Sequence, residues 1–209
     1  MRGLFITACF PPVSYMAEAI RADEIVIETM ETYSKQTIRN HYSIFGPNGK
    51  HTLSIPVIKT NGNNTLTRDV LISTHQPWQK IHWRSIETAY NNSPFFLYYK
   101  DPLSGLYEAK FKYLLDLNME ILTTLLRLLK ISKPVRVTDT FEKTPESAND
   151  FRDKFGTKKN HEKYNYPHYT QVFETRHGFI PGLSILDVIF NLGPEAALYL
   201  KSLNNSQSA

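Results

Sequence analysis

The sequence predicts an α/β fold with a small mixed sheet and an N-terminal βαβ-like unit, with α+β as the alternative. Residues 4–10 form an apolar stretch typical of a short buried strand, which Pro11 and Pro12 end. A helical pattern over 14–21 precedes the β-branched stretch 24–28, and strand, helix and strand in this order favour a parallel pair. Helical periodicity then dominates the centre of the chain.

The segment after the second strand predicts a strand pair. The turn residues 46–49 separate strands expected at 41–45 and 52–58, and a further strand is expected at 70–72. Two long helices follow at about 77–91 and 106–130, each with an apolar stripe, and 135–137 is expected to be a strand. The inner stripe of the first helix comprises Trp78, Ile81, His82, Ser85, Ile86 and Ala89.

The C-terminal part begins with a polar segment, 142–168, which is too long for an ordinary connection and is expected to be a mobile lid or a functional loop. Two short helices are expected at 183–190 and 194–203, broken at Gly193. Ser184 and Asp187 match a capping-box variant, in which the hydroxyl and the carboxylate both satisfy free amides. We therefore expect one domain over 1–203 and a disordered tail over 204–209.

Composition narrows the class of protein without naming its function. The 209 residues include one cysteine, which excludes an internal disulfide and a multi-cysteine zinc site and favours a reducing cytoplasm. No apolar run approaches the ~18 residues that span a bilayer. The net charge of +4 permits an anionic ligand, but it is too small and scattered to indicate nucleic acid as a partner. No phosphate-binding loop, dinucleotide fingerprint or paired metal-ligand histidines occur, so no metal site is expected and the cofactor stays unknown.

Short motifs occur in a fixed order over nearly the whole chain, at 10–15, 35–40, 53–57, 77–84, 92–95, 171–173, 177–187 and 191–194. This ordered set resembles the WbqC-like protein family, in the form common in Bacteroidota. The resemblance implies a role in bacterial surface polysaccharide assembly, because the family is named after genes of that kind. The wider family carries a Gln-Pro dipeptide near the end of its first strand, where this chain has Ile6-Thr7-Ala8.

One candidate site follows the second predicted strand. It comprises Tyr33, Lys35, Arg39, Asn40 and His41. Ligands of open α/β sheets bind beyond the carboxyl ends of the strands, where a lysine and an arginine can clamp a phosphate or carboxylate. In this interpretation Asn40 orients the substrate and His41 moves a proton. The alternative is a solvated basic loop whose arginine pairs with a surface carboxylate.

The second candidate site lies on the first long helix. Lys80 and Arg84 are four residues apart and share a face, so they form a ridge suited to an anion or, alternatively, a plain solvated surface. His82 lies on the inner stripe and is either a buried structural histidine or the acid/base catalyst. Asn118 interrupts the apolar stripe of the next helix, where it anchors a loop or touches a ligand.

The leading hypothesis is a cytoplasmic transferase or accessory enzyme that acts on a nucleotide-linked or phosphorylated sugar. The two cationic segments would converge on this anionic small molecule, with the polar segment 142–168 closing over it. The competing hypothesis is a non-catalytic binding or assembly module for polysaccharide enzymes. Such a module would expose a patch of aromatic side chains rather than a charged cleft.

Overall fold

The computed structural model describes residues 1–156 and 164–205, and its N-terminal part is a βαβ unit. This unit consists of β1 (Arg2–Ile6), α1 (Val13–Arg21) and β2 (Glu24–Glu28), and β1 pairs with β2 in parallel. The β-branched residues of β2 suit a pleated sheet, and the burial of one side of α1 against the core holds the crossover in place. The predicted α/β class and its parallel pair are confirmed.

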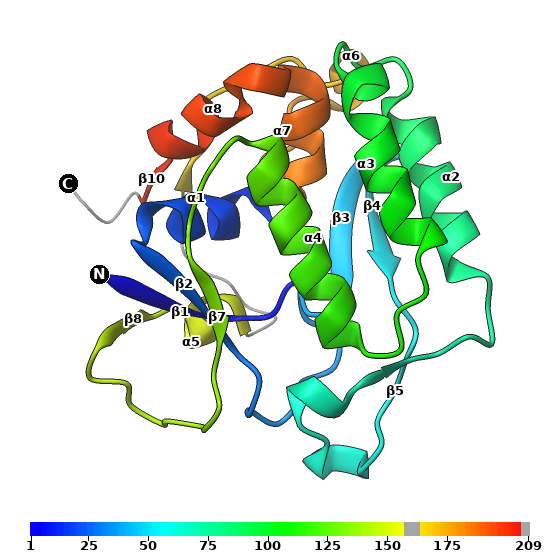
Figure 1. The fold of residues 1–209 in the computed structure, drawn as a ribbon. Coiled ribbons are helices and arrows are strands. Elements are labelled where there is room, and N and C mark those ends of the chain that lie inside the picture. Colours follow the sequence, from blue (N-terminus) through cyan, green and yellow to red (C-terminus); the bar gives the residue numbers. More distant parts are fainter. Residues whose placement is uncertain (157–163, 206–209) are drawn as a thin grey trace.

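Two further strands complete a four-stranded parallel sheet. β7 (Val135–Val137) pairs with β2, and β8 (Ala148–Asp150) pairs with β1, which gives the order β7-β2-β1-β8 (Figure 1). All four strands run in the same direction, so their carboxyl ends meet at one edge. This edge is where ligands of open parallel sheets bind.

The polar segment 142–168 contributes a strand to this sheet, and the sequence does not predict this contribution. Besides β8 it contains α5 (Arg152–Gly156), which packs against β1, and β9 (Tyr164–Asn165). Residues 157–163, part of the predicted lid, lie outside the described residues. Closure of this segment over a ligand stays a prediction.

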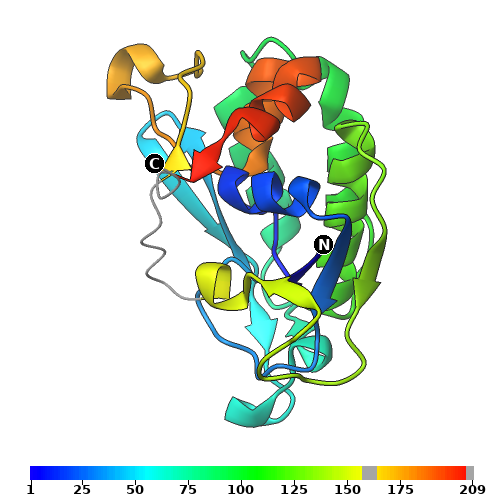
Figure 2. The same cartoon turned by 90° about the vertical axis from the view of Figure 1, so that its left-hand side faces the viewer.

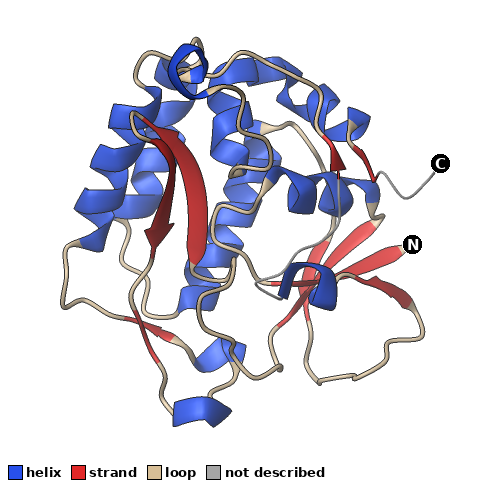
Figure 3. Ribbon diagram, turned by 180° about the vertical axis from the view of Figure 1, so that it is seen from behind, coloured by secondary structure: helices blue, strands red, loops and turns tan. Residues whose placement is uncertain are grey.

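A two-stranded hairpin lies apart from the parallel sheet. β3 (His41–Gly46) and β4 (Gly49–Ser54) pair antiparallel, and Figure 3 shows them in front of the helices. The prediction of one strand over 52–58 is wrong, because Pro56 lacks an amide hydrogen and interrupts the ladder. The chain instead starts β5 (Val57–Ile58), which pairs with β6 (Leu71–Ile72).

Three helices cover the centre of the molecule. α2 (Trp78–Tyr90) matches the predicted helix, whereas the predicted helix over 106–130 is wrong at its start. The chain forms α3 (Phe96–Glu108), breaks, and begins α4 (Leu114–Leu128). The sequence does not predict α3 because Pro102 and Gly105 lie within it. The burial of Leu103 and Tyr107 in the folded protein offsets the poor helix propensity of Pro102 and Gly105.

The C-terminal helices pack near α1 (Figure 2). α6 (Glu174–His177) is followed by α7 (Ile185–Leu192) and α8 (Ala196–Ser202), with the predicted break at Gly193, which has φ 52°. β10 (Asn204–Asn205) pairs with β9, so the predicted disordered tail begins with a short strand, and 206–209 lie outside the described residues.

The predicted capping box at the start of α7 is half correct. Ser184 Oγ accepts a hydrogen bond from the Leu186 amide at 3.3 Å, as expected. The Asp187 carboxylate does not cap the helix. It accepts hydrogen bonds from the Tyr90 hydroxyl at 3.0 Å and the Gln171 side-chain amide at 2.8 Å, and one from Tyr169. Burial raises the pKa of Asp187 despite these bonds.

Among the described residues, no helix has the length and apolarity needed to cross a membrane.

Candidate functional site

A cavity of about 420 Å³ opens near the carboxyl end of the parallel sheet, and we refer to it as the carboxyl-end cavity. It lies where β1 leads into α1, beside the turn after β2 and the β3–β4 hairpin. α1 begins at this cavity without a side-chain cap, and the start of a helix favours anionic groups. The lining includes Phe10, Pro12, Ser14, Gln36, Thr37, His41, Ser43, Lys50, Tyr166 and Ser184.

Backbone strain marks two walls of the carboxyl-end cavity. Phe10 has φ 39° and Gln36 has φ 57°, in the left-handed region that residues with a side chain rarely adopt. Among the described residues, only Lys130 is a third non-glycine residue with positive φ. Such conformations persist where surrounding contacts enforce them, and they are enriched at ligand sites.

Named contacts hold the two segments that contain the strained residues. The Ser184 hydroxyl donates to the Phe10 carbonyl at 2.9 Å, and the Phe10 ring packs against Tyr42 and Tyr107. The turn after β2 is tied to the β1 side of the site, because the Cys9 amide donates to the carbonyl of Ile38 at 2.8 Å. The two strained segments therefore form one rigid wall.

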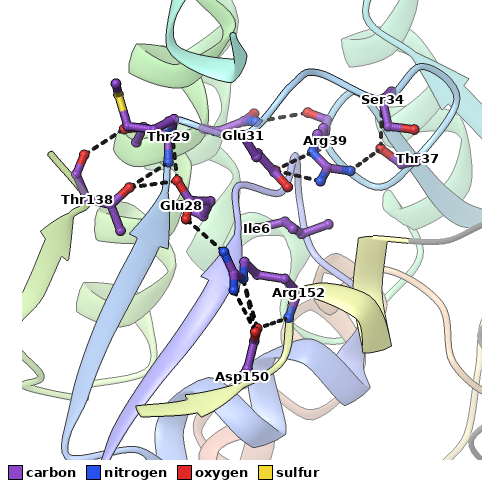
Figure 4. A network of polar contacts seen from close by, with 12 residues as sticks. Ile6, Glu28, Thr29, Glu31, Ser34, Thr37, Arg39, Thr138, Asp150 and Arg152 are labelled. Atoms are coloured by element: carbon purple, nitrogen blue, oxygen red, sulfur yellow. Dashed lines mark hydrogen bonds and ion pairs between the residues drawn. The ribbon is translucent and has the colours of Figure 1, made fainter. Parts of the chain in front are cut away.

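Arg39 lies behind this wall and not in the cavity. Its guanidinium is buried and donates to Glu31 Oε1 at 2.9 and 2.6 Å and to the Thr37 hydroxyl at 3.0 Å (Figure 4). Burial raises the pKa of Glu31, and the positive charge of Arg39 opposes this rise. Arg39 thus holds Thr37, a wall residue, and its predicted role as an anion clamp stays a prediction.

A second buried arginine ties the carboxyl ends of the strands together. Arg152 lies between Asp150, the last residue of β8, and Glu28, the last residue of β2 (Figure 4). It makes a two-pronged contact with Asp150, with nitrogen–oxygen distances of 3.0 and 2.7 Å, and contacts Glu28 at 3.0 Å. The Thr138 hydroxyl donates to the other oxygen of Glu28 at 2.9 Å. β2, β8 and the end of β7 are thereby fixed to one another at the carboxyl edge of the sheet.

Asn40 and His41 form the arrangement with the clearest chemical consequence. The Asn40 amide nitrogen donates to the Ile55 carbonyl at 2.9 Å, so its Oδ1, 3.0 Å from His41 Nδ1, accepts a hydrogen bond. The ring proton of neutral His41 is then on Nδ1, and Nε2 carries the lone pair. Because His41 lines the cavity, it is placed as a general base would be. Asn40 orients this histidine, and its predicted contact with the substrate stays a prediction.

Two other predicted site residues of this segment, Lys35 and Tyr33, do not line the carboxyl-end cavity. Lys35 is exposed and does not line the cavity. Tyr33 is buried, and its hydroxyl has no hydrogen-bond partner among the described residues. Burial raises the pKa of Tyr33 to about 12, so this hydroxyl stays protonated. Neither contacts the cavity, and their predicted substrate contacts stay predictions.

His82 is enclosed by aromatic side chains and is only 3% exposed. Its Nδ1 lies 3.0 Å from the Tyr42 hydroxyl and its Nε2 lies 3.2 Å from the Ser54 carbonyl, so both ring nitrogens have partners. Burial lowers the pKa of His82 to about 4, although the bond to Ser54 opposes this. These contacts favour the structural interpretation, and a proton-transfer role for His82 stays a prediction.

The two predicted cationic segments share no described cavity. Lys80 is exposed at the surface of α2 and lines none of them. Arg84 lines a second cavity, of about 380 Å³, between α2 and the β3–β4 turn. Lys50, which the sequence analysis does not single out, lines both cavities.

Asn118 anchors the turn after β2. Its amide nitrogen donates to the Arg39 carbonyl at 2.8 Å, while its Oδ1 has no partner among the described residues. The side chain borders a cavity of about 10 Å³, roughly the size of one water molecule. The structural alternative for Asn118 therefore fits the observed contacts.

The sequence analysis missed Gln36, Lys50 and Tyr166 as cavity residues. Gln36 lies inside the candidate segment 33–41, so its position in the sequence could have identified it as a cavity residue. A single lysine on a strand and a tyrosine in a polar segment carry no such signal, because only tertiary packing brings the hairpin and the segment 164–184 to one cavity. No cluster of three or more metal-binding side chains occurs among the described residues.

Comparison with known proteins gives one family and one relative. The model of the WbqC-like protein family matches residues 7–153 and 143–199. A Mycobacterium tuberculosis protein, "Uncharacterized protein Rv1507c", is 28% identical over 204 residues, which cover 86% of this chain and 88% of that protein. No solved structure matches significantly.

Proposed function

Since the chain belongs to the WbqC-like protein family, we propose that it is a transferase or accessory enzyme that acts on an anionic sugar intermediate of bacterial surface polysaccharide. The intermediate is nucleotide-linked or phosphorylated and binds in the carboxyl-end cavity. The observation that carries this proposal is the Asn40–His41 pair, which presents an imidazole nitrogen at a rigid polar cavity. We place the activity in the cytoplasm, as the sequence analysis predicts.

The lining of the carboxyl-end cavity suits a polyhydroxyl ligand. Ser43 and Gln36 line it with polar side chains, the Ser43 hydroxyl also bonding that of Thr52 at 2.9 Å, and the Tyr166 hydroxyl bonds the side chain of Ser14 at the start of α1. Sugars are recognised by such groups, because each ring hydroxyl both donates and accepts hydrogen bonds. Lys50 and the start of α1 add positive potential for an anionic substituent.

In the proposed step, His41 acts as the general base. Its Nε2 takes the proton from a sugar hydroxyl as that oxygen forms a bond to the group being transferred. The bond between this group and its donor breaks, and the leaving group departs with the electron pair. A histidine is suited to this because its ordinary pKa is near neutrality.

A binding module is the second candidate, favoured by exposed apolar side chains on α3. Leu97 is 67% and Tyr98 79% exposed, and adjacent exposed apolar residues of this kind occur at interaction surfaces. Recovery of glycan enzymes by the wild type and by His41→Gln alike, but not by a Leu97→Ser and Tyr98→Ser double variant, would favour this role.

Titration of the protein with a panel of nucleotide sugars and sugar phosphates tests the enzymatic proposal. Thermal shift identifies members that bind, and calorimetry measures their affinity. We expect at least one member to stabilise the wild type and Lys50→Gln to bind it more weakly. His41→Gln should bind the ligand but not convert it. Arg127→Gln, which removes an exposed arginine that lines no described cavity, is the control. No response to any member contradicts the proposal.

A further inference from the structure

We propose that the second cavity, between the β3–β4 turn and α2, binds the phosphate or diphosphate group of the substrate; we refer to it as the hairpin cavity. This inference rests on the proposed function and specifies where the anionic part of the substrate lies. The cavity has a volume of about 380 Å³. Its chemically active lining residues are Lys50, His51, Arg84, Ser85 and Thr88.

The charge of the hairpin cavity is uncompensated. Lys50 and Arg84 both line it, and neither takes part in an ion pair in the part of the chain that the structure describes. No aspartate or glutamate lines this cavity. Cations that share a concave surface repel one another, and a bound anion removes that repulsion.

The cationic side chains supply the charged hydrogen-bond donors of the hairpin cavity, whereas its two hydroxyl groups already donate to backbone carbonyls. The Ser85 hydroxyl donates to the Ile81 carbonyl at 2.9 Å, and the Thr88 hydroxyl donates to the Arg84 carbonyl at 2.8 Å. Their hydrogens are therefore already engaged. The guanidinium of Arg84 matches two phosphate oxygens with two parallel bonds, and Lys50 adds a point charge.

The turn that forms one wall is held in position from the opposite side. The Pro47 carbonyl accepts hydrogen bonds from Arg176 at 3.3 Å and from His177 Nε2 at 2.8 Å. Both donors belong to α6, so this end of the hairpin gathers further basic side chains. A fixed wall limits the reorganisation that binding requires.

Lys50 connects the two cavities. It lies on β4, the strand that borders the carboxyl-end cavity on one side and the hairpin cavity on the other. An elongated substrate can therefore place its sugar beside His41 and its phosphate beside Arg84. This arrangement separates recognition of the anion from the proton transfer.

Calorimetric titrations with inorganic phosphate, pyrophosphate and uridine diphosphate test the inference. The wild type is expected to bind pyrophosphate and uridine diphosphate, and Arg84→Gln to bind both about tenfold more weakly, as loss of a charge-assisted hydrogen bond implies. Arg127→Gln, an equal change of charge on exposed α4, should stay within about twofold of the wild type. Binding of inorganic phosphate alone would identify a site for a single phosphate, which also supports the inference. Tighter binding of uridine diphosphate than of pyrophosphate would show that the nucleoside adds contacts to the same site.

The outcomes separate this inference from the proposed function. Unchanged affinity in Arg84→Gln, or no binding of any of the three probes, overturns the hairpin site even where a sugar ligand binds at His41. Loss of pyrophosphate binding in Arg84→Gln, together with no response to any sugar in the panel, supports the hairpin site and contradicts the proposed function.

Discussion

The Oδ1 atom of Asn40 lies 3.0 Å from Nδ1 of His41, its neighbour in the chain. The other end of the same amide is fixed, because Nδ2 donates to the Ile55 carbonyl at 2.9 Å. An amide held in this way offers only its oxygen to the imidazole, so it selects one tautomer. The pair thus sets the chemistry of His41 before any ligand binds.

This relationship predicts a single tautomer for neutral His41. Long-range ¹H–¹⁵N NMR of the imidazole nitrogens should show the proton on Nδ1 in the wild type. In Asn40→Ala the share of the Nδ1–H tautomer should fall, since the amide oxygen that accepts from Nδ1–H is removed. A neutral wild-type ring with its proton on Nε2 would contradict the assigned role of Asn40.

His82 predicts a loss of stability in acid. Its pKa is about 4 in the folded protein against an ordinary 6.5, because burial disfavours the charged ring. The unfolded chain therefore binds a proton that the folded chain does not, and the free energy of unfolding falls as the pH drops from 6.5 to about 4. The loss amounts to about 3 kcal/mol at most. Urea unfolding at several pH values measures it, and His82→Gln should remove this part of the slope, whereas an unaltered slope would refute the assignment.

Arg152 predicts a large stability effect from a buried ion pair. Its partner Glu28 has a side chain only 1% exposed, so Arg152→Met leaves a carboxylate without its cation. We expect the free energy of unfolding to fall by about 3 kcal/mol or more. Addition of Glu28→Gln to Arg152→Met should recover part of this loss, because the neutral amide needs no cation. A cost below about 1 kcal/mol for the single variant would mean that solvent reaches Glu28.

Because the backbone at Gln36 is strained, we expect a substitution that relieves the strain to raise the free energy of unfolding and to weaken ligand binding. Gln36→Gly should raise the free energy of unfolding by up to about 1 kcal/mol, because glycine adopts positive φ without strain. It should also weaken ligand binding, since the wall of the carboxyl-end cavity becomes less rigid. Lys130→Gly is the matched control: Lys130 has φ 55° and lines no described cavity. An equal effect of both variants on ligand affinity would disconnect the strain from the site.

The sequence predicted elements well where local pattern and burial agree. The βαβ unit, α2 and the break at Gly193 follow from periodicity and from proline and glycine positions. The sequence did not predict α3, where Pro102 and Gly105 are tolerated because other residues of that helix are buried. It also failed for β8, a three-residue strand whose polar sequence offers no alternation to detect.

The candidate segment 33–41 follows β2, and His41 lines a cavity near the carboxyl end of the sheet. The roles predicted for its residues stay predictions. Arg39 and Asn40 carry the expected charge and amide, yet they face Glu31 and His41. These partners are near in the sequence, but distant contacts fix the segment that carries them. Asn40 Nδ2 donates to the Ile55 carbonyl, and Asn118 donates to the Arg39 carbonyl. No local pattern encodes those contacts.

The amino-acid sequence by itself determined the α/β class, the parallel βαβ start and the resemblance to the WbqC-like family, because these depend on local periodicity and on ordered motifs. Only the tertiary structure decided that His41 and Lys50 share a cavity, while Arg39 and His82 are enclosed. The physical reason is that burial and hydrogen-bond satisfaction are properties of the packed chain: an arginine becomes a wall support or an anion ligand according to whether a carboxylate packs beside it.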